Sequence, residues 1–351
     1  MIYCGIDVHK SYSRVAFVDE EGNAFASTRV DTTEPAVRAF FGNRKPMQIV
    51  LESGTHATWL AKVLADCGHE VTVAHARQVK LIAESKNKTD EIDAEILARL
   101  LRADPELLCE SYLRGEEAER LRTLLKARRH LVECRTKLSN AIRGFCRKGG
   151  YQLDSCSTAK LAEVLGEAEI PGPLKTALAP MGFSVFALTG WIQKMDRMLE
   201  EEADQYEIID VFKDICGVGT KTALAYMATI EDPHRFERSK QVGAYFGMCP
   251  SVDNSGNEKT DENNTGAITK QGDELVRSLL VQAAHVMLRD GQRDSELRQF
   301  GKRIEAKKGK KKAAVALARK LSVVMHTLWV TGRDYEPFYH ENHYGDSAGD
   351  G

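Results

Sequence analysis

Short apolar runs and amphipathic stretches alternate through residues 1–101 of the chain. The apolar runs end in charged or turn-forming residues, which is typical of strands, whereas apolar positions three or four residues apart indicate helices. The predicted strands are 2–7, 13–18, 24–30, 48–51 and 71–74, and the predicted helices are 34–41, 58–67 and 88–101.

The order of these elements is three strands, a helix, a strand, a helix, a strand and a helix. This is the order found in the α/β ribonuclease-H-like fold, in which helices cover a mixed sheet. We therefore predict an α/β domain of this type over residues 1–104.

The remainder of the chain has a helical pattern. Apolar positions at helical spacing predict one long amphipathic helix over 116–148, and further helices over 158–205 that break at 171–173 and at Gly182. Residues 105–207 are thus predicted to form a helical linker, either a coiled coil that pairs with another copy or an intramolecular bundle. Residues 208–331 are expected to form a mostly α C-terminal domain, followed by a flexible tail over 332–351.

Composition excludes several classes of protein. The hydrophobic fraction is 42%, but no run of about 18 apolar residues predicts a membrane helix. The first residues lack the pattern of a secretory signal. The eight cysteines are scattered without a C-x-x-C pair, which favours reduced thiols in a cytoplasmic protein over a structural zinc site.

The net charge of −2 hides two dense basic stripes. Residues 120–148 contain ten Lys or Arg residues against one acid, and residues 298–320 contain ten against one. Such stripes suit a phosphate backbone, although a solvated helix face is the alternative. The nucleic-acid contacts expected from the stripes are Arg120, Arg122, Lys126, Arg128, Arg129, Arg135, Lys137, Arg143, Lys307, Lys308, Lys310, Lys311 and Lys312.

Four acids stand where such a sheet would bring them together. Asp7 ends the first predicted strand, Glu52 follows the fourth, and Asp90 and Asp93 lie three residues apart on the last helix. Together they would repel one another unless a cation neutralised them, and Mg²⁺, with Mn²⁺ as a substitute, is the ion that oxygen ligands favour. Individually, each acid could instead cap a helix, form a turn or lie on the surface.

The first strand also permits another interpretation. Gly5-Ile6-Asp7 is similar to the phosphate loop of actin-like and Hsp70-like ATPases. Those proteins need a second glycine-rich hairpin for the nucleotide, and the sequence shows no convincing one.

Two further segments carry candidate chemistry. Gly217 and Gly219, followed by Lys221, are typical of the hairpin in a helix-hairpin-helix element, whose helix N-terminus can bind a phosphate; a packing corner is the alternative. The polar stretch 250–272 contains Ser255, a candidate nucleophile. The cations expected around this serine are Lys259, Lys270 and Arg277.

Taken together, the motifs resemble those of the insertion-sequence 110 (IS110) family of transposases, including its IS1111 subgroup, over residues 1–330. The motifs are GIDVHK at 5–10, LESGT at 51–55, NKTDEIDA at 87–94, GVG at 217–219 and GMCP at 247–250 ahead of Ser255-Gly256.

The resemblance implies a RuvC-like N-terminal domain with a D-E-D-D metal site, a coiled-coil linker and a C-terminal transposase domain with a catalytic serine. The motifs place the acids at Asp7, Glu52, Asp90 and Asp93, and the serine at Ser255. The resemblance also implies a structured non-coding bridge RNA that pairs with donor and target DNA, and a homo-oligomer, dimer or tetramer, that shares active sites between protomers. One departure is the acidic content of 251–265 beside the serine.

The residues and this resemblance together lead us to expect a Mg²⁺-dependent DNA recombinase in which Ser255 attacks the phosphodiester, and the resemblance implies that it is RNA-guided. Two alternatives stay open at this point. In a RuvC-like junction-resolving endonuclease, water would attack and the serine would be idle. A nucleic-acid scaffold would use the basic stripes without catalysis.

Overall fold

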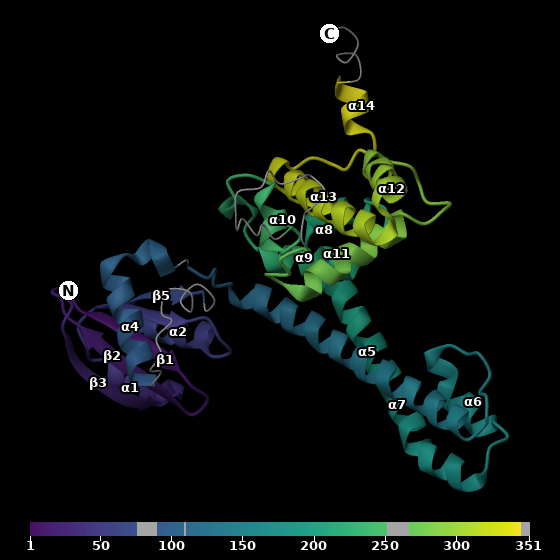
Figure 1. The fold of residues 1–351 in the computed structure, drawn as a ribbon, viewed down its shortest axis with the longest axis horizontal. Coiled ribbons are helices and arrows are strands. Elements are labelled where there is room, and N and C mark those ends of the chain that lie inside the picture. The colour runs from purple at the N-terminus through teal and green to yellow at the C-terminus, as the bar shows by residue number, and fades with distance from the viewer. Residues whose placement is uncertain (76–89, 109, 251–266, 345–351) are drawn as a thin grey trace, which may run out of the picture. The chain divides into compact units, whose positions relative to one another are not determined.

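The computed structural model describes residues 1–75, 90–108, 110–250 and 267–344, without the side chains of Asp90, Glu91 and Tyr344. The chain forms two compact units, Met1–Gly115 and Glu116–Gly351. Figure 1 shows the sheet in the first unit and the helices of the second. Each unit is described by itself below.

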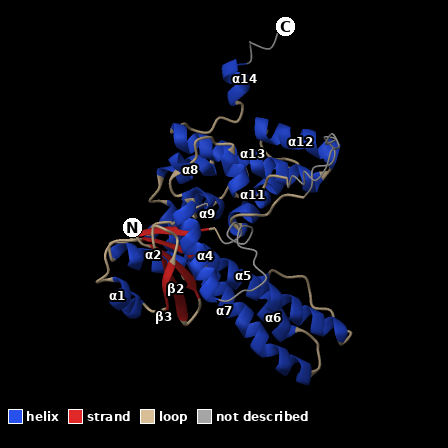
Figure 2. Ribbon diagram, turned by 60° about the vertical axis from the view of Figure 1, so that its left-hand side comes forward, coloured by secondary structure: helices blue, strands red, loops and turns tan. Residues whose placement is uncertain are grey.

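The first unit contains a five-stranded mixed sheet (Figure 2, red). Its order is β3-β2-β1-β4-β5; β2 is antiparallel to β1 and β3, whereas β1, β4 and β5 are parallel. The predicted strands and their order are confirmed. The bounds of the strands are β1 Tyr3–Val8, β2 Tyr12–Val18, β3 Ala24–Asp31, β4 Gln48–Glu52 and β5 Glu70–Ala74.

Helices cover both faces of this sheet because its strands are apolar on both sides. Ile6 and Leu51 pack on one face with α1 (Glu34–Phe41) and α2 (Ala57–Asp66). Val50 and Ala74 pack on the other face with α4 (Asp90–Ala103), which is followed by the short η1 (Pro105–Leu108). A mixed sheet with this arrangement is compatible with a ribonuclease-H-like domain.

The second unit begins with an antiparallel helix pair. The helix α5 (Glu116–Lys148) has the predicted bounds, and it pairs with α7 (Gly172–Ala203) through Arg120–Glu202 and Arg128–Asp196 ion pairs. At the far end of the pair, η2 (Thr158–Lys160) and α6 (Leu161–Glu167) close a small apolar cluster around Ile142, Leu161, Leu178 and Val185.

The predicted helix break at Gly182 is wrong, because α7 continues through it. Gly182 is buried, and a Cβ there would lie 3.2 Å from Leu165 Cδ2 and 3.7 Å from the Ala162 Cα. The glycine therefore allows α6 to approach α7 closely and does not end the helix.

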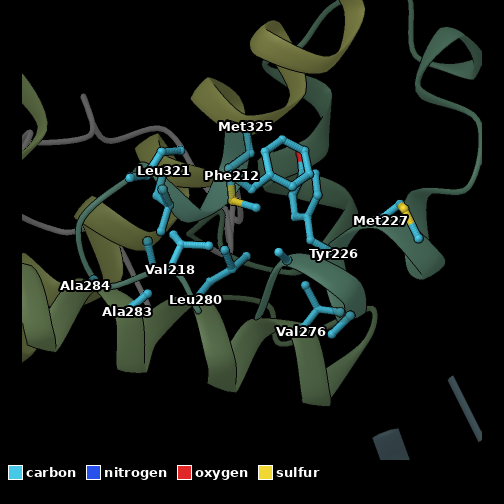
Figure 3. Packing of buried hydrophobic residues seen from close by; sticks show 14 of the residues in the cluster. Phe212, Val218, Tyr226, Met227, Val276, Leu280, Ala283, Ala284, Leu321 and Met325 are labelled. Atoms are coloured by element: carbon cyan, nitrogen blue, oxygen red, sulfur yellow. The ribbon is translucent and has the colours of Figure 1, made fainter. Parts of the chain in front are cut away.

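The rest of the second unit is a helical core. Phe212, Tyr226 and Met325 gather in it, and Leu280 of α11 faces them (Figure 3). The helices are α8 Glu207–Lys213, α9 Thr220–Ile230, η3 Pro233–Arg235, α10 Gln241–Tyr245, α11 Glu274–Met287, α12 Glu296–Lys308, α13 Lys310–Thr331 and α14 Tyr339–Tyr344. The tail, expected to be flexible from 332, carries α14, and the His340 amide donates to Glu296 Oε1.

Among the described residues, α13 is the one helix long and apolar enough to be considered as a membrane span. Half of its most apolar stretch is buried inside the protein. Leu317, Leu321 and Met325 are fully buried in the main core. These contacts are typical of a core helix.

Candidate functional site

Asp7 and Glu52 lie at matching positions on neighbouring parallel strands. The pairing of β1 with β4 ends with Ile6 opposite Leu51, and the two acids are the next residue of each strand. Residues opposite each other on parallel strands point to the same face, so both carboxylates lie at the same level at the carboxyl end of the sheet. They line a common pocket.

Helix α4 runs antiparallel to β1 on the face to which Asp7 points. Gly5 lies directly beneath the helix: a Cβ at this position would be 2.0 Å from the Ala94 carbonyl oxygen and 2.7 Å from the Ala98 amide nitrogen. At the start of β1, Tyr3 packs with the cluster that contains Leu101, near the end of the helix.

This geometry places Asp7 opposite the first turn of α4. Asp7 is two residues beyond Gly5 on the same face, a rise of about 6.6 Å along the strand. The same distance corresponds to roughly four residues along a helix. The first turn contains Asp90 and the half-buried Asp93. Three elements therefore bring the backbone positions of the four acids to one end of the sheet, while the side chain of Asp90 lies outside the described part.

The pocket also contains groups that the sequence did not single out. His9 Nε2 lies 3.0 Å from Asp7 Oδ2, and the imidazole packs against Tyr12 with ring centroids 4.9 Å apart. Lys10, Ser53 and His56 line the same pocket. The D-x-H spacing is the signal that could have found His9, because residues two apart in an extended chain share a face.

The donor set fits a hard divalent cation. Within the described side chains, no group of three or more His, Cys, Asp or Glu residues comes together closely enough to hold a metal. Asp7 and Glu52 nevertheless offer carboxylate oxygens to one pocket, and oxygen ligands are those that Mg²⁺ and Mn²⁺ prefer. Two carboxylates at one level also repel each other, which a cation between them would relieve.

Ser255 and Lys259 lie outside the described residues, but both ends of their segment are visible. The Thr269 amide donates to the Cys249 carbonyl, at 2.9 Å, and Pro250 bridges Ile268. The backbones approach closely at two glycines with positive φ. A Cβ on Gly247 would lie 1.9 Å from Gln271 O, and one on Gly272 would lie 2.0 Å from Tyr245 O. The stems of the segment are therefore held together.

The two other predicted cations of this region differ in their surroundings. Arg277 donates to the Phe246 carbonyl at 3.0 Å and so supports the first stem. Lys270 is exposed, and its own backbone adopts a positive φ of 53° while its amide donates to Gly247 O. Of these two cations, only Lys270 has a side chain exposed enough to contact a ligand.

A buried ion pair joins the second stem to α5. Arg122 Nη2 lies 2.9 Å from Asp273 Oδ2, and Nη1 donates to Thr229 Oγ1 of α9 at 2.6 Å. Asp273 also caps α11 by accepting from the Val276 amide. Burial alone would raise the pKa of Asp273, but this amide and the charges of Arg122 and Lys126 together lower it below its usual value. Arg122 is therefore committed to internal contacts.

Most of the predicted arginines of the first basic stripe make internal contacts. Arg120 binds Glu117 and Glu202, Arg128 binds Asp196, and Arg129 binds Glu133 and Glu274. Arg143 reaches the carbonyls of Asp154 and Cys156. Lys126 and Lys137 are exposed and Arg135 is half-buried. Among the predicted contacts on this helix, Lys126 and Lys137 are thus exposed cations that are not drawn into the ion pairs described above.

The second stripe presents a compact group of charges at the corner between α12 and α13. Lys307, Lys308, Lys310, Lys311 and Lys312, here called the corner lysines, are all exposed. Gly309 turns the chain between them with a φ of 80° and has no side chain to cap α13. Three lysines at a helix N-terminus are unfavourable in the field of the helix dipole unless an anion is near.

The glycine hairpin between α8 and α9 is closely packed. Gly217 has a φ of 83°, and a Cβ there would lie 2.6 Å from the Ala283 carbonyl of α11. Lys221 Nζ lies 3.3 Å from Asp196 of α7, and the Thr220 hydroxyl donates to Glu200. Gly219 has open space around it within the described part of the chain. Gly217 thus has a packing role, and phosphate binding by Gly219 and Lys221 stays a prediction.

Comparisons with known proteins identify two family models that follow one another along the chain. A DEDD-type IS110 family model, described as a transposase, matches residues 4–148, and a model described as transposase IS116/IS110/IS902 family matches residues 209–300. The first match covers Asp7, Glu52 and the start of α4 and indicates use of a divalent metal.

Similar proteins extend over nearly the whole chain. The transposase for insertion sequence element IS1111A of Coxiella burnetii is 25% identical, over 94% of this chain and 90% of its own length. A probable family 20 transposase of Pseudomonas aeruginosa is 24% identical, over 95% and 98%. A pilin gene-inverting protein of Moraxella bovis is 22% identical, over 97% and 99%. With both domain models matched in order, the chain is a transposase enzyme and belongs to the IS110 family.

Proposed function

We propose that this transposase cuts donor and target DNA and rejoins the strands at a divalent-metal site formed by Asp7, Glu52, Asp90 and Asp93. The observation that carries the proposal is the matched placement of Asp7 and Glu52 on parallel strands, opposite the first turn of α4. Mg²⁺ is the expected ion and Mn²⁺ its substitute.

The four acids would hold the ion and leave part of its coordination sphere to the DNA phosphate. When bound, such a cation supplies charge neutralisation at the phosphate and lowers the pKa of an attacking hydroxyl group. His9, 3.0 Å from Asp7, would orient that carboxylate, and the exposed Lys10 at the pocket would attract the phosphate.

Ser255 is the proposed nucleophile. Its Oγ would attack the phosphorus, the strand's leaving oxygen would depart, and the DNA end would stay attached to the protein until a second DNA end displaces the serine. Covalent attachment retains the phosphodiester energy that rejoining requires, whereas attack by water would lose it. The closed stems at Gly247 and Gly272 hold together the two described ends of the stretch that carries the serine.

The proposed partners are donor and target DNA and a structured bridge RNA. In this arrangement base pairing would select the sequence and the protein would bind the backbone. The corner lysines, Lys126, Lys137 and Lys270 are the exposed cations suited to that role. We further propose a cytoplasmic homo-oligomer, dimer or tetramer, whose active centres combine acids and serine from different protomers.

The metal site is tested by strand cleavage of a supercoiled donor plasmid with Mg²⁺, with Mn²⁺ and in EDTA. Asp7→Asn and Asp93→Asn should lower the cleavage rate by ~100-fold or more, equivalent to about 3 kcal/mol, and leave DNA binding intact. Glu95→Gln is the matched control, since Glu95 lies on the same helix and pairs with Arg99 on its surface. Full cleavage in EDTA would contradict the proposal.

The serine is tested by trapping the protein–DNA adduct on denaturing gels. The adduct should disappear in Ser255→Ala and persist in Ser251→Ala, a serine of the same segment. Cleavage without an adduct would favour the water-attack endonuclease. An adduct that maps to Tyr245 would assign the chemistry to another nucleophile.

A second candidate, site-specific DNA inversion, is favoured by the similarity to pilin gene-inverting proteins. The chemistry would be the same and the two sites would lie on one molecule. A plasmid with two sites in inverted orientation tests it: inversion of the intervening segment supports this use of the enzyme, and insertion alone argues against it.

A further inference from the structure

The pocket with Asp7 and Glu52 has a neighbour that none of the proposed chemistry uses. Both pockets lie in the first unit, and His56 lines both of them. The second pocket lies between the start of α1 and the exposed side of α2 and is lined by Thr32, Thr33, Trp59 and Lys62 among others. His56 is therefore the residue at which the two pockets adjoin.

Trp59 and His56 form a fixed pair at this junction. His56 precedes α2 and Trp59 is in its first turn. The indole Nε1 donates to His56 Nδ1 at 3.1 Å, and the two rings meet edge to face with centroids 6.1 Å apart. Because the indole nitrogen can only donate, Nδ1 must be the acceptor, and the ring proton of His56 belongs on Nε2.

The hydrogen bond satisfies the one polar atom of the indole. Trp59 is half-buried and packs against the core under α1 and α2, which fixes the orientation of the ring. Trp59 also lines the second pocket. A half-exposed indole whose polar atom is already satisfied is suited to stacking.

The charges of the second pocket favour a neutral occupant. Arg38 is bound by Glu34 at 2.8 Å and by Asp66 at 3.0 Å, and all three line the pocket. The two acids are balanced by Arg38 and Lys62, so the lining carries no net charge to attract a phosphate. The exposed Thr33 contributes a polar group to the rim. A planar, uncharged ring with polar edges fits such a site better than an anion does.

We propose that Trp59 stacks on an unpaired nucleobase of the DNA strand, adjacent to the phosphate that is cut at the acid pocket. His56 would donate from Nε2 to that nucleotide and so fix the position of the base relative to the phosphate. The assignment rests on the proposed DNA cleavage at Asp7 and Glu52, and it requires the base to leave the duplex stack, since a paired base hides its faces.

Fluorescence of Trp59 tests the stacking without any chemistry. The chain has three tryptophans, so the full-length double variant Trp191→Phe/Trp329→Phe leaves Trp59 as the reporter. In EDTA, a single-stranded DNA of the transposon end should quench this emission, and the same sequence as a blunt duplex should not. Absence of quenching by bound single strand would overturn the proposal, as would quenching by single-stranded RNA alone.

Affinity for the same single strand provides the second measurement. Trp59→Leu should weaken binding about 5- to 150-fold, the range found when aromatic residues that stack on a base are removed. Trp59→Phe, which keeps a ring, should retain most of the affinity and controls for folding. Trp191→Leu is the matched control, because Trp191 is exposed in the other unit. Equal affinity of Trp59→Leu and wild type would overturn the proposal.

The outcomes also separate this inference from the proposed function. Quenching without any cleavage in Mg²⁺ would leave the base site standing and remove the catalytic assignment. Normal cleavage without quenching would remove the base site and leave the catalytic assignment standing.

Discussion

The buried ion pair between Arg122 and Asp273 is expected to govern the stability of the second unit. Arg122 and Asp273 expose only 10% and 12% of their side chains, and Arg122 also holds Thr229. Arg122→Met keeps the length of the side chain and leaves the Asp273 carboxylate buried without its cation. Removing one partner of such a pair costs about 3–5 kcal/mol.

A matched pair of variants makes this magnitude measurable. Arg120→Met removes an exposed arginine of the same helix, whose side chain is 48% accessible, and should cost about 0–1 kcal/mol. Arg122→Met/Asp273→Asn removes the stranded charge as well and should recover part of the stability. Urea unfolding of the full chain can be monitored by the circular dichroism signal of helices. This signal reports on the second unit, because nearly all elements of that unit are helices.

The dependence on pH provides an independent check. The folded-state pKa of Asp273 is lowered, so the stability that its charge contributes is complete above the unfolded pKa of about 3.9 and is lost as pH falls through the folded pKa. That acid sensitivity should shrink in Arg122→Met. The reasoning about burial is refuted if the free energies of unfolding of Arg122→Met and Arg120→Met differ by less than about 1 kcal/mol, which is roughly the uncertainty of such extrapolations.

Three further outcomes follow from backbone contacts and surface charge. Gly5→Ala should push α4 away from β1 and abolish cleavage, because the added carbon meets the Ala94 carbonyl oxygen at 2.0 Å. Gly144→Ala, at a helical position with open space around it, should instead raise the free energy of unfolding by about 0.5–1 kcal/mol. Gly247→Ala should disrupt the stem beside Gln271, eliminating the serine adduct but not Mn²⁺ binding measured by electron paramagnetic resonance. Changing all five corner lysines to Gln should make DNA binding less dependent on salt. The slope of log K against log salt concentration should become shallower by ~0.9 for each DNA phosphate that these lysines neutralise in the wild type. An unchanged slope would contradict their role.

Local patterns were sufficient to predict the sheet and the position of the acids. Each strand of the first unit has its own apolar run, and Asp7 and Glu52 stand where those runs end. The register that places them side by side follows from parallel pairing, which the order of elements already indicated. Their approach to α4 depends on Gly5, whose missing side chain is visible in the sequence only as a strand glycine.

Features that depend on distant partners could not be predicted in this way. Arg122 has the same local sequence context as its basic neighbours, yet it is buried against Asp273, 151 positions further along the chain. The break expected at Gly182 failed because tertiary contact with α6 outweighs the weak helix propensity of glycine. Trp59 and His56 are neighbours because they are three residues apart at the start of a helix, but only the fold places His56 at the pocket of Asp7 and Glu52.

The continuous helix α5 also sets a rule for how this chain can change in length. Its early residues Leu121 and Leu125 belong to the main core, whereas Ile142 and Cys146 belong to the cluster at the far end. Inserting one residue between them would rotate the far cluster by about 100° and shift it by about 1.5 Å relative to the core. An insertion of seven residues, about two turns, restores the rotational position of the far cluster about the helix axis. It also requires an equal insertion in α7, so that the Arg120–Glu202 contact is kept. The helix pair should therefore vary in length only in such matched steps.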